Sequence, residues 1–502
     1  MSQAWRHVIR REYIDLDVEG GELDGFALQA QLAALCHGEL TVALDEAFSR
    51  AVPGEEHWQF DRIDVDAGHF TQETFAGDFV AAVAAAVKVQ IKERQAQAIA
   101  QPEVSAEEGD VQWSGAQSID QAFLYFLATG VLPWWCRLPE GQTLESMLDK
   151  AWSEVPGQGQ GGSTEALALV ALMRVLSSAV PRLRMVRQFS QPFLGRVLER
   201  LAPTALVVLR EVVAAVHHEW ALALPAAVPE QAWVATFVCA VTQQTISQRH
   251  LLEAWATLTP EFITPAIIAS VLRAATTHAV DLSLKQLRDK TSVSESKPAT
   301  STAAPSRRDA QDATSPQPAD GSRSEHRMAI SAKPLDLHED VFIDCAGMVL
   351  LHPFLPRLFE RLELIADDHL LQPDRALALL HFLATGQSSA PEHALVLPKL
   401  LCGMEAFEIA GAPVELGEAD RTEAENLLQS AIDYWPAIGQ TTLDGFRGNF
   451  LVRPGKLGKR GDEDLLQIEK QSWDILLGQL PWSIGVVRLP WMRRMLWVEW
   501  PY

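Results

Sequence analysis

Apolar and polar residues alternate in two short segments near the N-terminus, and each is followed by a longer segment with helical spacing. The alternation covers residues 7–18 and 58–66, which predicts two strands. Large apolar residues recur at helical spacing over 26–50 and 71–100, which predicts two helices with one apolar face. Residues 1–100 are therefore expected to form an N-terminal α+β unit built from two strand–helix pairs.

The polar positions of the two predicted strands are mostly aspartates. They are Asp15, Asp17, Asp61, Asp64 and Asp66. Side chains two residues apart in a strand point to one face, so such carboxylates line the face opposite the core. A solvated strand face is the favoured interpretation. An acidic edge that binds a partner is one alternative, and paired carboxylates for acid–base chemistry or calcium binding are another.

The segment 118–288 is rich in alanine and leucine and is expected to form a helical domain. Because proline ends or kinks a helix, the prolines of this segment predict several short helices. These prolines occupy positions 181, 192, 203, 225, 229, 260 and 265. Thr259, directly before Pro260, is expected to cap a helix that runs to Arg273.

Composition changes abruptly at residues 289–334, where Ser, Thr, Ala and Pro dominate. No large apolar residue occurs between Val293 and Met328. Such a segment cannot bury enough apolar surface to offset the entropy lost on ordering. It is therefore expected to be a disordered linker.

Helical spacing returns after this linker, over 341–402 and again over 420–435. The rest of the segment 335–502 mixes strand-like runs with tryptophan-containing turns, which predicts a helical and mixed α/β C-terminal domain. The whole chain is thus predicted to be mainly α with small α+β portions. It would have strand–helix units at the N-terminus, a multi-helix middle and a mixed C-terminal region.

A short sequence recurs in the two predicted helical regions. FLATG occupies residues 126–130 and returns at 382–386, with leucines before it in both places. Gly130 and Gly386 are each expected to end a helix as the left-handed residue that follows its last turn. Duplication of a helical unit and coincidence are both compatible with so short a match.

The charge balance limits the classes of partner. There are 65 acidic against 42 basic residues, which gives a net charge of -23. An acidic surface repels phosphate groups, so nucleic acid and anionic membranes are not expected as partners. The N-terminus carries charges where a signal peptide would be apolar, and no apolar run reaches the length of a membrane helix. The protein is therefore expected in the cytoplasm, or incorporated into an assembly built there.

Candidate catalytic and metal-binding motifs are weak. The glycine cluster at 156–164 has the glycine spacing of a phosphate-binding loop, but it lacks the lysine and follows a predicted helix. The adjacent His217 and His218 point about 100° apart on a helix and do not form a metal pair. The 5 cysteines are scattered and fit reduced thiols. No enzyme activity, cofactor or metal is predicted.

The chain holds 15 tryptophans, and several cluster near position 134 and at the C-terminus. Tryptophan is a frequent anchor of protein interfaces, and it also fills corners of a core. The candidates for partner binding are Trp134, Trp135, Trp482, Trp491, Trp497 and Trp500. Core packing of the same rings is the alternative.

Several blocks of the chain resemble the contractile injection system tape measure protein family of phage-tail-like particles. The N-terminal blocks are HVIRREYIDLDV and FDRIDVDAG, which together resemble the strand pair of the family, and then FLYFLATGVLPWW. Later blocks are LLHPFLPRLFERLELI, RALALLHFLATG, LPKLLCGM and FRGNFLVRPGKL. The most specific block is LLQIEKQSWDILLGQLPWSIGVVRLPWMRRMLWVEW, close to the C-terminus.

This resemblance implies a non-enzymatic assembly component that helps to set the length of the tube and sheath. The implied partners are tube, sheath or baseplate proteins. The resemblance does not imply an oligomeric state for this chain. A ruler is expected to be a long uninterrupted helix, whereas 28 prolines and 30 glycines interrupt this chain. A chaperone or adaptor for cargo or baseplate subunits, absent from the finished particle, is therefore the alternative.

Overall fold

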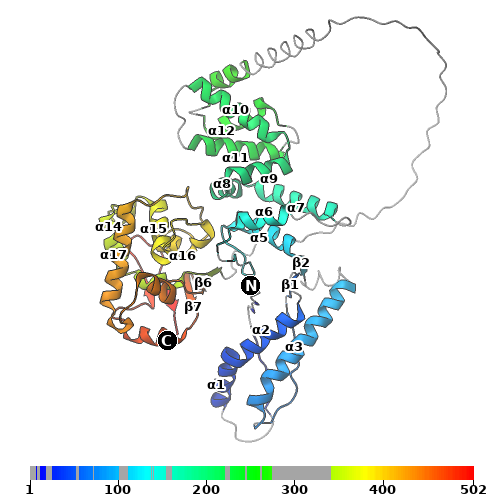
Figure 1. The fold of residues 1–502 in the computed structure, drawn as a ribbon, viewed down its shortest axis with the longest axis vertical. Coiled ribbons are helices and arrows are strands. Elements are labelled where there is room, and N and C mark those ends of the chain that lie inside the picture. The colour runs from blue at the N-terminus through cyan, green and yellow to red at the C-terminus, as the bar shows by residue number, and fades with distance from the viewer. Residues whose placement is uncertain are drawn as a thin grey trace, which may run out of the picture. The chain divides into compact units, whose positions relative to one another are not determined.

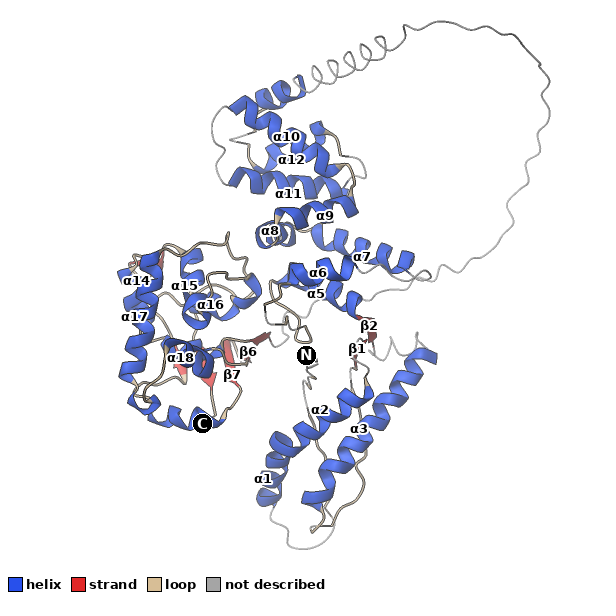
Figure 2. Ribbon diagram, viewed as in Figure 1, coloured by secondary structure: helices blue, strands red, loops and turns tan. Residues whose placement is uncertain are grey.

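The computed structural model is mainly helical with small sheets, which confirms the predicted fold class (Figures 1 and 2). It describes residues 7, 9, 12–18, 25–52, 56–60, 62–71, 73–100, 111–136, 138–139, 141–153, 161–220, 227–242, 246–260, 263–273 and 341–501. The predicted linker at 289–334 lies outside these residues.

Two compact units emerge from the contacts within the chain. One unit comprises residues 1–206, 237–245 and 340–502, and the other comprises 207–236 and 246–339. The finer division predicted from the sequence, into 1–100, 118–288, 289–334 and 335–502, stays a prediction.

The N-terminal region is built on two long helical segments. The first comprises α1 (Gly25–Leu35), the π-helical turn η1 (Cys36–Leu40) and α2 (Thr41–Ala51). The second is α3 (Phe75–Ala100). Both predicted helices are therefore confirmed. Their shared core contains Leu40, Leu44, Ala51, Phe75, Phe79, Val80, Val87 and Ile91.

The predicted strands of this region are largely wrong. A short strand, β1 (Glu56–Gln59), pairs antiparallel with β2 (Val111–Ser114), and the register joins Gln59 to Val111. The described residues of 7–18, and those beyond β1 up to 71, belong to no strand. Exposure still alternates along 62–67, as in an extended chain. Ile14, Ile63 and Val65 pack against the core of the two helical segments, whereas Leu16 and Val18 are exposed.

Short helices follow, as the prolines predicted. They are α5 (Gly115–Thr129), α6 (Leu144–Ser153), α7 (Gly161–Leu176), α8 (Ala179–Gln188), α9 (Gln191–Leu201), α10 (Ala205–Trp220), α11 (Ala227–Thr242) and α12 (Gln248–Leu258). Ser190 caps α9 by accepting a hydrogen bond from Phe193 N–H at 3.3 Å.

The expected capping role of Thr259 is wrong. Thr259 follows the last residue of α12, and its hydroxyl donates to the Trp255 carbonyl at 3.2 Å. The next helical residues are 265–273. Thr264 precedes them, and its carbonyl accepts from Ile268 N–H at 3.0 Å. The prediction failed because two threonine–proline pairs lie close together and the second one starts the helix.

The C-terminal region combines helices with a sheet. Its strands are β3 (Val341–Ile343), β4 (Ile365–Ala366), β5 (His369–Leu370), β6 (Gly455–Arg460), β7 (Glu463–Ile468), β8 (Val486–Val487) and β9 (Leu496–Glu499). Its α-helices are α14 (Leu355–Arg361), α15 (Pro373–Thr385), α16 (Val396–Leu401), α17 (Glu418–Tyr434) and α18 (Leu443–Phe446). Shorter turns are η2 (Ala346–Leu351), η3 (Glu392–Ala394), η4 (Pro436–Ile438), η5 (Arg447–Leu451) and η6 (Ser472–Gln479).

The main sheet has the strand order β3-β6-β7-β9-β8. Strand β9 runs parallel to β7, with Leu466 opposite Val498, and the remaining pairs are antiparallel. The parallel pair requires a crossover, which residues 469–495 provide through η6 and β8. The chain's last strand is therefore part of the core of this region.

Candidate functional site: the tryptophans and a buried ionic cluster

Two of the candidate tryptophans are buried in the C-terminal region. Trp491 is 9% exposed, stacks on Phe359 with ring centroids 5.1 Å apart, and donates from Nε1 to the Leu401 carbonyl at 2.7 Å. Trp500 is 5% exposed and donates from Nε1 to Asp474 Oδ2 at 3.1 Å. In both residues the apolar ring is packed inside the protein and the indole N–H group has a hydrogen-bond partner there.

The other candidates are half-buried. Trp482 donates to the Leu350 carbonyl at 3.0 Å, and the Arg460 guanidinium lies 4.7 Å from the Trp497 ring centroid. Trp134 and Trp135 lie in the turn that follows α5. The burial of the C-terminal rings favours the core-packing alternative for them. Partner binding by any of the six stays a prediction.

A more exposed tryptophan escaped the sequence analysis. Trp473 is 40% exposed, and its neighbour Ile475 is 74% exposed, both in η6. The Trp473 Nε1 donates to the Asn449 carbonyl at 2.8 Å. Clustering in the sequence did not single out Trp473, because this residue stands apart from the tryptophan-rich segments.

Asp474, a residue of η6, forms a buried ion pair with Arg453. Arg453 Nη1 donates to Oδ1 at 2.7 Å and Nη2 donates to Oδ2 at 2.8 Å, which is a bidentate geometry. The Gln471 N–H and the Trp500 indole also donate to this carboxylate. Burial by itself would raise the pKa of Asp474, but these donors lower it overall. The C-terminal tryptophan is thereby held by a charged network.

A second ionic cluster joins segments from both sides of the predicted linker. Arg184, on α8, and Glu392, in η3, have completely buried side chains, and Nε donates to Oε2 at 3.1 Å. The same guanidinium donates to the Leu127 carbonyl at 2.6 Å and to the Phe407 carbonyl at 3.1 Å. Lys399, also completely buried, donates from Nζ to Glu392 Oε1 at 3.0 Å.

Two cations share one carboxylate in this cluster. Burial lowers the pKa of Lys399, and the neighbouring Glu392 only partly opposes this effect. Removing one member of a buried ion pair typically costs about 3–5 kcal/mol because the other is left uncompensated. No local pattern indicates this cluster, since Arg184 and Glu392 are 208 residues apart.

The two FLATG segments end their helices in the same way. Gly130 has a φ of +82° and Gly386 has a φ of +73°, so both adopt the left-handed conformation. Their N–H groups donate to the carbonyls of Phe126 and Phe382, each at 2.7 Å. The predicted helix-ending role of both glycines is therefore confirmed.

The likeness extends to an arginine that follows each segment in the chain. Arg184 donates to the Leu127 carbonyl, and Arg447 donates from Nε to the carbonyl of the equivalent Leu383 at 3.2 Å. In both helices the FLATG threonine donates to the carbonyl four residues earlier at 2.8 Å. This shared arrangement favours duplication over coincidence.

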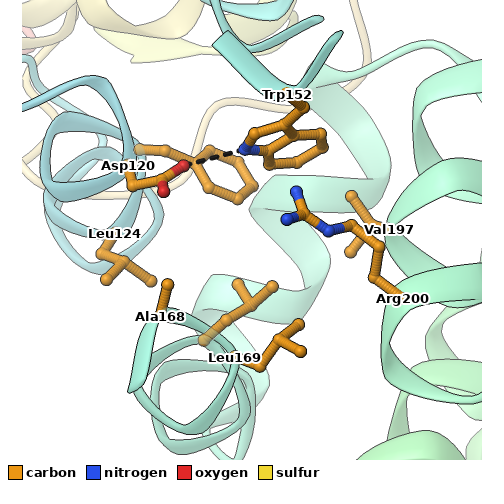
Figure 3. A pocket seen from close by; sticks show the side chains of 9 residues that line it. Asp120, Leu124, Trp152, Ala168, Leu169, Val197 and Arg200 are labelled. Atoms are coloured by element: carbon orange, nitrogen blue, oxygen red, sulfur yellow. Dashed lines mark hydrogen bonds between the residues drawn. The ribbon is translucent and has the colours of Figure 1, made fainter. Parts of the chain in front are cut away.

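Figure 3 shows a small cavity lined by α5, α6, α7 and α9. Trp152 Nε1 donates to Asp120 Oδ1 at 2.9 Å, and the Arg200 guanidinium lies 4.4 Å from the Trp152 ring centroid. The cavity measures about 30 Å³, which is about the volume of one water molecule in the liquid. It is far smaller than ordinary small-molecule sites of about 300 Å³ or more.

The remaining candidate chemistry finds little support in the described part of the chain. Residues 161–164 of the glycine cluster begin α7, and 154–160 lie outside the described residues. The side chains of the histidine pair 217–218 lie outside them too. No group of three or more His, Cys, Asp or Glu that could hold a metal ion occurs among the described residues. Within the same residues, no helix combines the length and the apolar character needed to span a membrane.

A comparison with protein families gives one match. The family model described as contractile injection system tape measure protein matches residues 6–500, which include every element described above. No curated protein and no solved structure matches the chain.

Proposed function

The chain belongs to the contractile injection system tape measure protein family, and we propose that it is a non-enzymatic assembly component of a contractile particle. The observation that carries this proposal is the match over residues 6–500, because it includes both the N-terminal helices and the C-terminal sheet. The family is structural, and its name implies contacts with other particle components such as tube and sheath.

Within this role we propose that the chain contributes to control of tube and sheath length through docked folded parts. The longest described helix, α3, has 26 residues. At about 1.5 Å per residue it spans about 39 Å, so the described helices do not form one continuous helical ruler.

The proposed partners are tube, sheath or baseplate proteins, and the proposed compartment is the cytoplasm or the particle assembled there. The net charge of -23 supports protein partners over nucleic acid or anionic membranes. No cofactor or metal is proposed.

Affinity purification during assembly tests this proposal. The full chain, tagged at its N-terminus, is isolated from cells at the time when particles form, and its bound proteins are identified by mass spectrometry. We expect tube, sheath or baseplate proteins at stoichiometric levels. Recovery of the chain without any particle protein, at every stage of assembly, would contradict the proposal.

A chaperone or adaptor role is the second candidate, and the interrupted helices favour it over a ruler. The same mass spectrometry on finished, sheathed particles separates the two functions. A structural component remains in the particles at a fixed ratio to the baseplate. A chaperone binds precursors and is absent from the finished particle.

A further inference from the structure

The C-terminal region contacts the helices α5 and α8 although a long stretch of chain separates them. Residues 207–339 lie between them in the sequence and belong mostly to the other compact unit. Arg184 of α8 and Glu392 of η3 meet although they are 208 residues apart. Continuity of the chain does not account for this contact, so its cause has to lie in the two surfaces themselves.

The apolar part of the contact lies at the end of α5. Val131, which directly follows the glycine of the first FLATG segment, is 2% exposed and belongs to the core of the C-terminal region. Tyr125 packs against the same core. The Phe126 ring meets the His393 ring edge to face, with ring centroids 6.2 Å apart. Such burial favours association but selects no particular partner, because the hydrophobic effect is not directional.

The polar part of the contact lies along α8. Arg184 donates to the Glu392 carboxylate, and its Nη2 also donates to the Phe407 carbonyl at 3.1 Å. The Glu392 N–H donates in return to Gln188 Oε1 at 3.0 Å. These bonds fix the register of the two surfaces, because each requires a donor and an acceptor at matching positions.

Burial of the charges makes the contact selective. The side chains of Arg184, Glu392 and Lys399 are completely buried. Glu392 and Lys399 both belong to the C-terminal region, so only the arginine is supplied by α8. Taking a charge out of water costs several kcal/mol, which only a well-placed opposite charge offsets. A surface without an arginine at this place would leave Glu392 Oε2 without its buried donor.

We propose that the surface of α5 and α8 binds residues 340–502 as a partner, through non-covalent contacts strong enough to hold them without the connecting chain. This contact is here named the α8 interface, and its members are Val131, Arg184 and Gln188 on one side and Glu392, Lys399 and Phe407 on the other. Contacts between domains of one chain usually permit relative motion, whereas completely buried charges require one fixed arrangement. The α8 interface goes beyond the proposed assembly role and does not depend on it.

Cutting the connecting chain tests whether the α8 interface is sufficient. A recognition sequence for a site-specific protease is inserted between Thr314 and Ser315 of the full chain, and the purified protein is cut to completion. We expect the two pieces to elute together in size-exclusion chromatography, at the volume of the uncut protein. At about 1 μM protein, recovery of about nine-tenths of the material in this peak corresponds to a Kd of about 10 nM.

Matched arginine variants test whether the buried charges select the partner. Arg184→Met removes the cation that α8 supplies but leaves the Glu392–Lys399 pair balanced. We expect it to raise the Kd of the two pieces about 100-fold, so that more than half of them separate at about 1 μM. The control Arg196→Met removes an arginine of α9 that is 42% exposed and pairs with Asp149 at 2.6 Å. It should leave the Kd unchanged.

A milder variant keeps the test decisive if Arg184→Met does not fold. Gln188→Ala removes the acceptor of the Glu392 N–H and should raise the Kd about fivefold, as expected for one hydrogen bond. Circular dichroism of the uncut variants checks that their helical content matches the parent chain.

Three results would overturn the α8 interface as a binding surface. The first is that the cut pieces of the parent chain elute separately at about 1 μM. The second is that the cut protein elutes well ahead of the uncut protein, which would show exchange of pieces between copies. The third is that Arg184→Met and Gln188→Ala both bind as tightly as Arg196→Met. None of these results bears on binding of particle proteins by the intact chain, so the two proposals fail separately.

Discussion

The helix ends at Gly130 and Gly386 have the same five residues and the same kind of arginine, but their surroundings differ. Thr129, Gly130 and Val131 are all buried, whereas Gly386 and the residues after it are exposed. The first end continues into apolar VLPWW and the second into polar QSSAP. The FLATG segment thus determines where the helix stops, and the residues after the glycine determine whether its end is covered.

The arginine–carboxylate pairs at the two helix ends also differ in burial. Arg184 is completely buried and is paired with the equally buried Glu392. Arg447 is 9% exposed and is paired with Asp444, whose side chain is 91% exposed. A carboxylate in water compensates a cation weakly, whereas a buried one is required once the cation is buried. The comparison therefore predicts large effects at the first helix end and small effects at the second.

The largest difference is expected from removing the carboxylates. Glu392→Gln keeps the shape of the side chain but leaves Arg184 and Lys399 without their counter-charge. We expect it to lower the free energy of unfolding by about 3–5 kcal/mol. Asp444→Asn, the matched control, should change it by less than about 0.5 kcal/mol. Urea denaturation followed by circular dichroism measures both, and equal effects would show that burial does not separate the two ends.

The next largest difference in stability is expected from replacing the two glycines. A β-carbon at Gly130 would lie 2.8 Å from Glu392 Oε1 and 3.0 Å from Arg184 Nε, whereas at Gly386 the nearest atom is Arg447 Nη1 at 3.3 Å. Both positions carry the cost of a left-handed alanine, about 1–2 kcal/mol. Gly130→Ala should therefore destabilise by about 3 kcal/mol and Gly386→Ala by about 1 kcal/mol. Thermal melting of the two variants tests this order, and a larger loss from Gly386→Ala would reverse it.

Acid should weaken the first helix end. The His393 ring lies 6.2 Å from the Phe126 ring, and burial lowers the pKa of His393 to about 4. The unfolded chain, with an ordinary pKa of about 6.5, takes up a proton first as the pH falls. Stability is therefore full above about pH 6.5 and is lost as the pH falls toward 4.

The expected loss from this histidine between pH 7 and pH 5 is about 2 kcal/mol, because pH 5 lies between the folded pKa of about 4 and the unfolded pKa of about 6.5. The variant His393→Gln should flatten the pH dependence of the urea midpoint. Some slope should persist, since burial also lowers the pKa of His381 in α15. An unchanged slope in His393→Gln would contradict the assignment.

The smallest contrast concerns the threonines. Thr129 Oγ1 accepts from Val131 N–H at 3.3 Å in a buried site, and Thr385 Oγ1 accepts from Gln387 N–H at 3.1 Å in an exposed one. Thr129→Val leaves a buried N–H unpaired and should cost about 1 kcal/mol. Thr385→Val should cost less than about 0.5 kcal/mol because water replaces the hydroxyl. Calorimetric melting temperatures can resolve this difference, and equal losses would argue that the second end is covered too.

Local patterns explain which parts of the fold were predictable from the sequence. The helices at 26–50, 71–100 and 420–435 and the helix-ending glycines depend on spacing within a few residues, and the structure confirms them. The strand predicted at 58–66 extends only to Gln59, because alternation reports one-sided packing and the helical core provides that packing for Ile63 and Val65. In the segment 7–18 the alternation did not predict burial either, since Leu16 and Val18 are exposed.

Non-local contacts account for what the sequence did not show. Nothing near Arg184 indicates that it meets Glu392, since the chain passes through the predicted linker between them. Tryptophan clustering likewise did not distinguish an interface from a core, and the structure buries Trp491 and Trp500 while it exposes Trp473. Removing the chain after Leu480 would therefore disrupt the C-terminal core, so single surface substitutions are the better test of binding.

The central claim is that this protein takes part in assembling a contractile particle. Electron microscopy of particles from cells that lack the gene, compared with cells in which the gene is restored, tests this claim most directly. We expect either no particles or particles of scattered length in the deletion, and particles of a single narrow length after restoration. Particles of normal number and length in the deletion would contradict it.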